Sequence, residues 1–248
     1  MRVFGLLGRS LAHSFSQTYF TQKFKQLGIT DCRYELFELA EASDLPALLA
    51  RYPHLTGLNV TIPYKEQIWP YLTRVAPSAA LVGAVNVIEF LADGGLVGHN
   101  TDYVGFRESL RAFYPPDAPH RQALVLGTGG AAKAVAVALQ ELAIPYQFVS
   151  RGPHGSSLTY EDLTPGVLEQ YSLLVNTTPL GTYPAVEECP PLPYSALTPQ
   201  HYLFDLIYNP GKTLFLQRGL AAGAHIQNGL EMLERQAEAA WAIWTASR

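Results

Sequence analysis

Polar side chains that could take part in proton transfer gather in the segment from residue 57 to residue 65. The segment predicts an apolar strand over residues 57–62 whose side chains alternate between two faces, with Asn59 and Thr61 on the same face. Lys65 follows at the expected mouth of this strand. Its ammonium group could act as a general acid or base if a partner holds it partly out of water. The ordinary alternative is a solvated surface lysine.

A carboxylate that could partner this lysine follows a second pair of predicted strands, residues 85–90 and 96–99. Asp102 would be the anionic partner of Lys65, although Thr101 and Asp102, at the start of a helix, also suit a helix cap. Asn86 lies within the first of these strand patterns, where Asn is disfavoured. It is therefore either a hydrogen-bonded core amide or an amide presented to a ligand.

Two serines, Ser14 and Ser16, follow the strand predicted for residues 3–8. Ligands of parallel α/β units bind beyond the carboxyl ends of strands, so these hydroxyls could hold a carboxylate or a polyol. The competing interpretation is that one of them caps the helix predicted for residues 17–27. Near the other end of the chain, Gln236 lies on one face of the last predicted helix, either as a covered amide or as a ligand contact.

The glycine-rich segment in the middle of the chain has the order strand, turn, helix. Residues 123–126 predict a buried strand, residues 127–130 a turn and residues 131–142 an Ala-rich helix. With Ala132 at the third glycine position, the spacing is typical of dinucleotide-binding folds, which place a pyrophosphate at the helix N-terminus.

The next predicted strand, residues 146–150, indicates which dinucleotide the chain binds. It ends in Ser150 and Arg151 and has no acid that could hold a ribose 2′-hydroxyl. A guanidinium suits a 2′-phosphate, which favours NADP. The alternative is that Arg151 is a solvated loop charge.

Composition excludes several classes of function. Of the 248 residues, 48% are hydrophobic and 15% charged, and the formal net charge is −4, typical of a globular protein without affinity for nucleic acid. No run reaches the roughly 18 apolar residues of a membrane span, and no signal-peptide segment opens the sequence. Cys32 and Cys189 lack metal-ligand spacing. We therefore expect a cytoplasmic protein with no metal, nucleic-acid or membrane partner.

The predicted strands and helices alternate twice over, on either side of a Pro-rich linker at residues 114–119. This pattern predicts two α/β units. Because the glycine-rich segment opens the second unit, the first is the natural place for the substrate.

Together these segments resemble the shikimate dehydrogenase family, most specifically through residues 59–65 and 100–102. The resemblance follows the family's order along the chain and rests on His13-Ser14-Phe15-Ser16, Asn59-Val-Thr-Ile-Pro-Tyr-Lys65, Gly83-Ala-Val-Asn86, Asn100-Thr-Asp102, Gly127-Thr-Gly-Gly-Ala131, Asn176-Thr-Thr-Pro-Leu-Gly181, Asp205-Leu-Ile-Tyr-Asn-Pro210 and Asn228-Gly-Leu-Glu-Met-Leu233 with Gln236.

The resemblance implies two α/β domains and a reversible, NADP-dependent reduction of 3-dehydroshikimate to shikimate. Residues 1–100, with residues 223–248 returning to them, would form a mainly parallel substrate-binding sheet. Residues 101–222 would form a Rossmann-like NADP-binding domain. The resemblance also implies a monomer or a homodimer.

The resemblance assigns roles to single residues as well. Lys65 and Asp102 would be the catalytic pair, and both would touch the substrate. The other substrate-binding residues would be Ser14, Ser16, Asn59, Thr61, Asn86, Tyr208 and Gln236. The cofactor would be held by Gly127, Thr128, Gly129, Gly130, Ala131, Ser150, Arg151, Thr177, Leu206 and Gly229.

Some positions depart from the family's pattern. Ser150-Arg151-Gly152 stands where the family usually has Asn-Arg-Thr, which removes one hydroxyl from the 2′-phosphate site. Gln17 replaces a usual Pro, while Leu206 and Thr182 stand where Met is common.

Two alternatives stay open. One is a quinate/shikimate dehydrogenase that uses NAD or NADP, against which Ser16, Thr61 and Arg151 argue. The other is a catalytically silent ligand-binding relative, against which the presence of both Lys65 and Asp102 argues.

Overall fold

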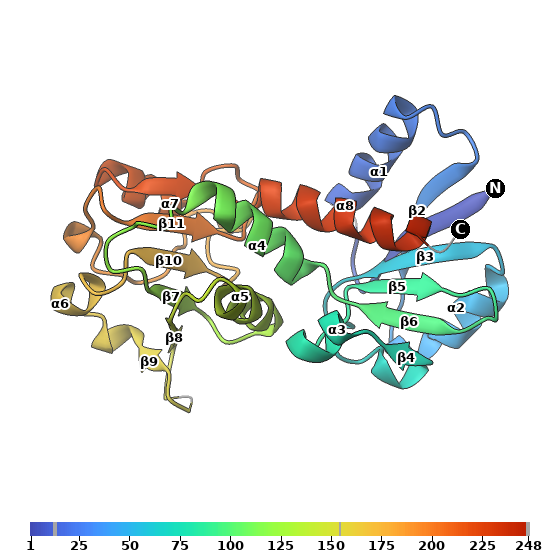
Figure 1. Ribbon diagram of the computed structural model, residues 1–248, viewed down its shortest axis with the longest axis horizontal. Coiled ribbons are helices and arrows are strands. Elements are labelled where there is room, and N and C mark those ends of the chain that lie inside the picture. Colours follow the sequence, from blue (N-terminus) through green and yellow to red (C-terminus); the bar gives the residue numbers. More distant parts are fainter. Residues whose placement is uncertain (12–13, 154, 247–248) are drawn as a thin grey trace. The chain divides into compact units, whose positions relative to one another are not determined.

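The computed structural model describes residues 1–11, 14–153 and 155–246 (Figure 1). These residues divide into two compact units, Met1–Thr101 with Gln236–Arg248, and Asp102–Arg235. The second boundary differs from the one expected from the sequence, because residues 223–235 belong to the second unit. The physical reason is β12 (His225–Gln227), which pairs in parallel with β11 (Tyr202–Asp205) at the edge of the second sheet.

The first unit contains a six-stranded, mainly parallel sheet in the order β2-β1-β3-β5-β6-β4. β1 is parallel to β2 and β3, and β4 is parallel to β6, whereas β5 runs antiparallel to β3 and β6. The strands are β1 (Arg2–Gly8), β2 (Cys32–Glu38), β3 (Leu55–Val60), β4 (Arg74–Val75), β5 (Val87–Phe90) and β6 (Leu96–His99).

Both faces of this sheet are buried, because the side chains of β1 alternate between two apolar clusters. Val3 and Leu7 pack in the cluster that includes Leu45 of α2 (Leu45–Arg51). Phe4 packs in the other cluster, with aromatic residues of α1 (Phe15–Gln26) and of α8 (Leu230–Ala246). The unit also contains α3 (Pro77–Val82) and two short 3₁₀ turns, η1 (Ala42–Asp44) and η2 (Trp69–Tyr71).

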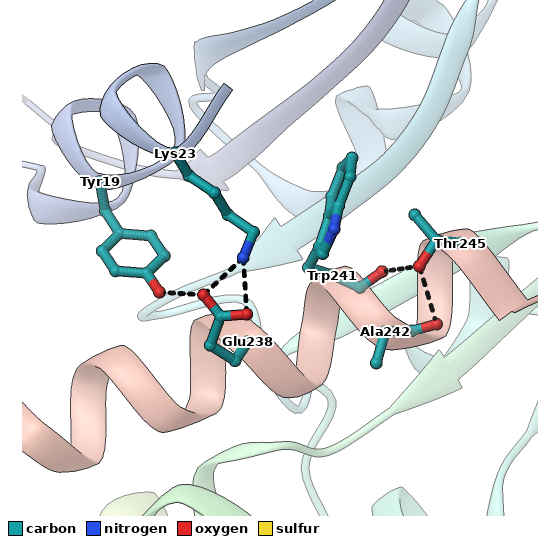
Figure 2. Close-up of polar contacts among 6 residues, drawn as sticks. All are labelled: Tyr19, Lys23, Glu238, Trp241, Ala242 and Thr245. Atoms are coloured by element: carbon teal, nitrogen blue, oxygen red, sulfur yellow. Dashed lines mark hydrogen bonds and ion pairs between the residues drawn. The ribbon is translucent and has the colours of Figure 1, made fainter. Parts of the chain in front are cut away.

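Polar contacts tie α1 to α8 within this unit, as Figure 2 shows. The Lys23 ammonium donates to both carboxylate oxygens of Glu238 at 2.6 Å, and the Tyr19 hydroxyl donates to the same carboxylate. Later in α8, the Thr245 hydroxyl donates to the carbonyl of Trp241 at 2.8 Å. The helix that starts beside Ser14 and Ser16 is therefore fixed against the helix that carries Gln236.

Several element boundaries in the first unit differ from those predicted. The strand expected over residues 57–62 ends at Val60, and the one expected over residues 85–90 begins at Val87, so Thr61 and Asn86 lie just outside strands. Residues 66–72 have a helical sequence pattern, but no α-helix forms there; the chain makes turns and η2 instead. Pro70 has no N–H to donate to the carbonyl four residues before it, which disfavours an α-helix there.

The second unit contains a fully parallel six-stranded sheet in the order β12-β11-β10-β7-β8-β9. Its other strands are β7 (Ala123–Leu126), β8 (Tyr146–Ser150), β9 (Leu158–Thr159) and β10 (Leu173–Asn176). When β7 to β12 are renumbered 1 to 6, the strand order becomes 6-5-4-1-2-3, which is the order of dinucleotide-binding folds. This order confirms the Rossmann-like fold. The strand order reverses between β7 and β10, and ligands of such sheets bind beyond the carboxyl ends at that point.

Helices cover both faces of this sheet. One apolar cluster packs α4 (Asp102–Phe113) and α5 (Gly130–Glu141) against the sheet, and the opposite cluster includes residues of α6 (Pro165–Leu168) and α7 (Leu214–Ala221). Two further 3₁₀ turns are η3 (Tyr160–Asp162) and η4 (Tyr194–Ala196). Within the described ranges, no helix is both long enough and apolar enough to cross a membrane.

Two element boundaries in the second unit differ from the sequence pattern, and this changes the elements to which predicted site residues belong. The helical sequence pattern covers residues 106–113, but α4 starts at Asp102. The strand-like sequence pattern covers residues 202–208, but β11 ends at Asp205, so Leu206 and Tyr208 lie in the loop after β11.

Candidate functional site

Ser14 occupies the position before α1 but does not act as a helix cap. Its side chain accepts no capping hydrogen bond. Its hydroxyl oxygen is buried and has no hydrogen-bond partner among the described residues. A buried hydroxyl without a partner costs about 1–3 kcal/mol, so such a group in a folded protein calls for an explanation. A ligand that hydrogen-bonds to Ser14 would supply one.

A buried tyrosine that the sequence analysis missed connects Ser16 to Asn59. The Tyr34 hydroxyl donates to Asn59 Oδ1 at 2.7 Å. Burial raises the pKa of Tyr34, and a hydrogen bond from the Ser16 side chain opposes this rise. The two predicted site residues, which come from α1 and β3, are thus joined through β2.

A second group of buried amides and hydroxyls continues from Asn59. Asn59 Nδ2 donates to the carbonyl of Asn86 at 3.4 Å. The Asn86 carboxamide accepts from the Thr101 backbone N–H at 2.7 Å and donates to the Thr101 hydroxyl at 3.0 Å and to Gln236 Oε1 at 3.5 Å. Thr101, which also suited a helix cap, therefore uses its side chain in this group. Hydrogen bonds run without a break from Ser16 to Gln236.

Thr61 and Lys65 are fixed to the same part of the sheet by their backbones. Thr61 N donates to the carbonyl of Leu7 at 2.9 Å, so the residue after β3 is held to β1. Val85 N donates to the carbonyl of Lys65 at 2.8 Å, which places Lys65 beside the residue that precedes Asn86. Lys65 is half-buried.

In the second unit, the glycine loop after β7 has the features that a dinucleotide requires. Gly127 has φ 107°, and a Cβ there would lie 2.8 Å from Thr177 Oγ1, so only glycine fits. A Cβ at Gly129 or Gly130 would meet no protein atom within 4 Å. The start of α5 is therefore open to a pyrophosphate, and the residues present fit NADP at this point.

The end of β8 carries the predicted 2′-phosphate site. Arg151 is exposed, whereas Ser150 is buried and its hydroxyl donates to the carbonyl of Gly152 at 2.5 Å. Ser150 also shares a 2.9 Å hydrogen bond with the hydroxyl of Ser157, the residue before β9. The sequence analysis missed Ser157, which adds a second hydroxyl beside a motif that has Gly152 in place of a Thr.

The loop after β11 carries Leu206 and Tyr208, and Asp205 anchors it. Asp205 accepts from Asn176 Nδ2 at 3.0 Å, from Ile207 N at 3.1 Å and from the Thr213 hydroxyl at 2.5 Å. Burial raises the pKa of Asp205 to about 6, and these donors oppose the rise.

Gly229 lies near this loop as well. Gly229 N donates to the carbonyl of Ile207 at 3.1 Å, and a Cβ at Gly229 would lie 2.1 Å from the carbonyl oxygen of Leu206. Glycine is therefore required by this close approach. Burial raises the pKa of Tyr208.

The predicted residues divide between the units. Those connected in the first unit are Ser16, Asn59, Asn86 and Gln236, whereas Asp102, the first residue of α4, and Tyr208 belong to the second. His13 lies outside the described residues. Across the ranges that the structure describes, no group of His, Cys, Asp and Glu side chains could hold a metal ion.

Comparison with known proteins identifies relatives along nearly the whole chain. The family model of the shikimate dehydrogenase substrate binding domain matches residues 6–88. A shikimate dehydrogenase (NADP(+)) of Clostridium beijerinckii is 38% identical over 256 residues, which cover 98% of this chain and 92% of the relative.

Solved structures show the same fold. The shikimate 5-dehydrogenase of Thermus thermophilus, in complex with NADP(H) and shikimate, is 33% identical, with a TM-score of 0.85 over 99% of this chain and 94% of that one. A quinate dehydrogenase of Corynebacterium glutamicum, in complex with NAD, is 28% identical, with a TM-score of 0.87 over 99% and 94%. The fold alone thus does not separate shikimate from quinate, or NADP from NAD.

Proposed function

The chain belongs to the shikimate dehydrogenase family, and from this premise we propose that it catalyses the reversible, NADPH-dependent reduction of 3-dehydroshikimate to shikimate. This reaction is a step in the biosynthesis of chorismate and the aromatic amino acids. The observation that carries the proposal is the hydrogen-bonded group from Ser16 to Gln236. Two residues before its start lies the Ser14 hydroxyl, which has no partner within residues 1–11, 14–153 and 155–246. Hydroxyl and amide groups suit a ligand with a carboxylate and several ring hydroxyls.

In the proposed reaction the carbonyl carbon accepts a hydride, which bound NADPH supplies, and the carbonyl oxygen accepts a proton. Lys65 donates this proton from its ammonium group, and its positive charge stabilises the developing alkoxide. In the reverse direction the neutral amine of Lys65 removes the proton from the shikimate hydroxyl. Asp102 orients Lys65 and contacts the neighbouring hydroxyl of the substrate.

Ser14 and Ser16 hold the carboxylate in this proposal, Ser16 by turning toward the substrate the hydroxyl proton that it gives to Tyr34 in the ligand-free chain. The remaining substrate contacts come from Asn59, Thr61, Asn86, Tyr208 and Gln236. On the cofactor side, Gly127, Thr128, Gly129, Gly130 and Ala131 hold the pyrophosphate, Ser150 and Arg151 the 2′-phosphate, and Thr177, Leu206 and Gly229 the nicotinamide half.

A second candidate is a quinate/shikimate dehydrogenase that accepts NAD. It is favoured by the high structural similarity to a quinate dehydrogenase and by Gly152, which has no hydroxyl for a 2′-phosphate. Arg151 argues against it, because an exposed guanidinium pairs with the negative charge of a 2′-phosphate, which the ribose of NAD does not carry.

Three further expectations are part of the proposal: the protein works in the cytoplasm, as a monomer or a homodimer, and without a nucleic-acid or membrane partner. Sedimentation equilibrium of the purified chain tests the oligomeric state.

Product analysis tests the reaction itself. The protein is incubated with 3-dehydroshikimate and NADPH, and shikimate is quantified by chromatography and mass spectrometry. We expect the wild type to form shikimate and NADP⁺ in a one-to-one ratio. The control variant Lys25→Ala, which removes an exposed lysine of α1, should do so at the same rate. Lys65→Ala and Asp102→Asn should give at most a few per cent of that rate. Equal product from Lys65→Ala would contradict the mechanism, and no product from the wild type would contradict the function.

A further inference from the structure

We propose that Tyr34 is a positioning residue that orients the Asn59 carboxamide, so that Asn59 offers an N–H donor and not its carbonyl oxygen to the substrate. The inference rests on the proposed function and deepens it. It adds Tyr34 to the site and specifies that Asn59 is the donor in its hydrogen bond with the substrate.

The Tyr34 ring itself is held firmly. Tyr34 lies in β2, is 5% exposed, and stacks on Phe20 of α1 with ring centroids 4.6 Å apart and an interplanar angle of 9°. Its ring is fixed by this packing, so its hydroxyl has one place to point. That place is between the Ser16 side chain and Asn59 Oδ1, which lies 2.7 Å away.

The direction of these hydrogen bonds follows from the available protons. A tyrosine hydroxyl has one proton to donate, and here it goes to Asn59 Oδ1, while the oxygen accepts from Ser16. The rotated carboxamide would turn its NH₂ group toward Tyr34 and its carbonyl oxygen toward the backbone oxygen of Asn86. Two acceptors would then face each other at about the 3.4 Å that now separates Nδ2 from Asn86 O. The observed orientation avoids this repulsion.

One hydrogen of the Asn59 amide is left over in this arrangement. Nδ2 carries two hydrogens and makes one long hydrogen bond within the described chain, to Asn86 O. Asn59 is 5% exposed, so the other hydrogen has little access to water. The substrate atom that meets it must be an acceptor, such as the oxygen of a ring hydroxyl.

Tyr34→Phe tests the inference, because it removes the hydroxyl and keeps the stacked ring. One neutral hydrogen bond corresponds to roughly a three- to tenfold effect, so we expect KM for shikimate to rise by about that factor. The kcat value and the KM for NADP should stay within about twofold of the wild type. Tyr114→Phe is the matched control: it removes another buried hydroxyl, which contacts Ser172 at 2.6 Å in the second unit, and should leave both KM values unchanged.

A double-mutant cycle with Asn59→Ala separates positioning from a general structural role. If Tyr34 acts through Asn59, Tyr34→Phe should change KM for shikimate by less than about twofold in the Asn59→Ala background. The same increase in both backgrounds, or no increase in the wild-type background, would overturn the inference while the proposed function stands.

Asn59→Asp gives a second test, which does not depend on whether the Tyr34→Phe variant folds. Its carboxylate can still accept from Tyr34 but has no hydrogen for the substrate, so KM for shikimate should rise at least as much as in Asn59→Ala. A near-normal KM would overturn the inference. Failure of the wild type to oxidise shikimate would instead refute the proposed function, and the inference with it.

Discussion

Substitution of Ser14 by Ala is expected to stabilise the ligand-free protein and to weaken substrate binding. Among the residues that the structure describes, the buried Ser14 hydroxyl has no partner, and Ser14 makes no capping bond that the substitution could remove. An unsatisfied buried hydroxyl costs about 1–3 kcal/mol, and because the Ser14 residue is only half-buried we take the lower end, about 1 kcal/mol. For a chain of this size, this corresponds to an increase in Tm of about 2–4 °C.

The effect on the substrate has the opposite sign. A hydrogen bond from Ser14 to a carboxylate contributes about 1.5–3 kcal/mol, so KM for shikimate should rise by roughly 10- to 100-fold. The assay pairs thermal unfolding of the ligand-free protein with initial-rate kinetics. Ser109→Ala is the control, because the Ser109 hydroxyl, in helix α4, is also buried and has no partner in the described part of the chain. It should raise Tm similarly and leave KM unchanged.

Two results would refute this reasoning. A decrease in Tm of several degrees for Ser14→Ala would mean that the hydroxyl stabilises the folded chain, as a helix cap does. An unchanged KM would mean that the substrate does not contact Ser14, and the partnerless hydroxyl would need another explanation.

Three further predictions concern catalysis, cofactor choice and pH. Lys65→Ala should lower kcat by about 10²- to 10⁴-fold with a nearly unchanged KM for shikimate, measured by steady-state kinetics; unchanged turnover would exclude Lys65 as the acid. Arg151→Ala should weaken NADPH binding far more than NADH binding in a fluorescence titration, and equal weakening would remove Arg151 from the 2′-phosphate site. The raised pKa of Asp205, about 6, means that the folded state binds its proton more tightly than the unfolded state does. Stability should therefore fall as pH rises from about 4 to about 6, by up to about 3 kcal/mol. Asp205→Asn should flatten this pH dependence in urea unfolding experiments, and an unaltered slope would contradict the assignment.

The sequence predicted the two-unit α/β architecture because its strongest signals are local. Residues 123–126, the glycine turn and the Ala-rich helix each follow from short-range patterns, and the parallel sheet follows from their alternation. The boundaries between the two units were less predictable. The pairing of His225 with Tyr202 depends on residues far apart in the sequence, which is why residues 223–235 were placed in the wrong unit.

The positions of Ser14, Asn59, Asn86 and Gln236 could be picked from residue type and context, whereas their supports could not. Tyr34 lies in a strand pattern in which an aromatic residue is ordinary. Its contacts with Asn59 and Phe20 arise only when β2, β3 and α1 pack together. Thr101 suited a helix cap, and only its approach to Asn86 and Gln236 in the folded unit shows another use.

The measurement that tests the central claim most directly is the initial rate of oxidation of shikimate and of quinate, each with NADP and with NAD, followed at the absorbance band of the reduced nicotinamide. The account predicts rapid turnover of shikimate with NADP and little turnover in the other three combinations. Comparable rates with quinate or with NAD would contradict the proposed specificity and favour a quinate/shikimate dehydrogenase. No turnover with any pair, with shikimate binding retained, would contradict catalysis itself.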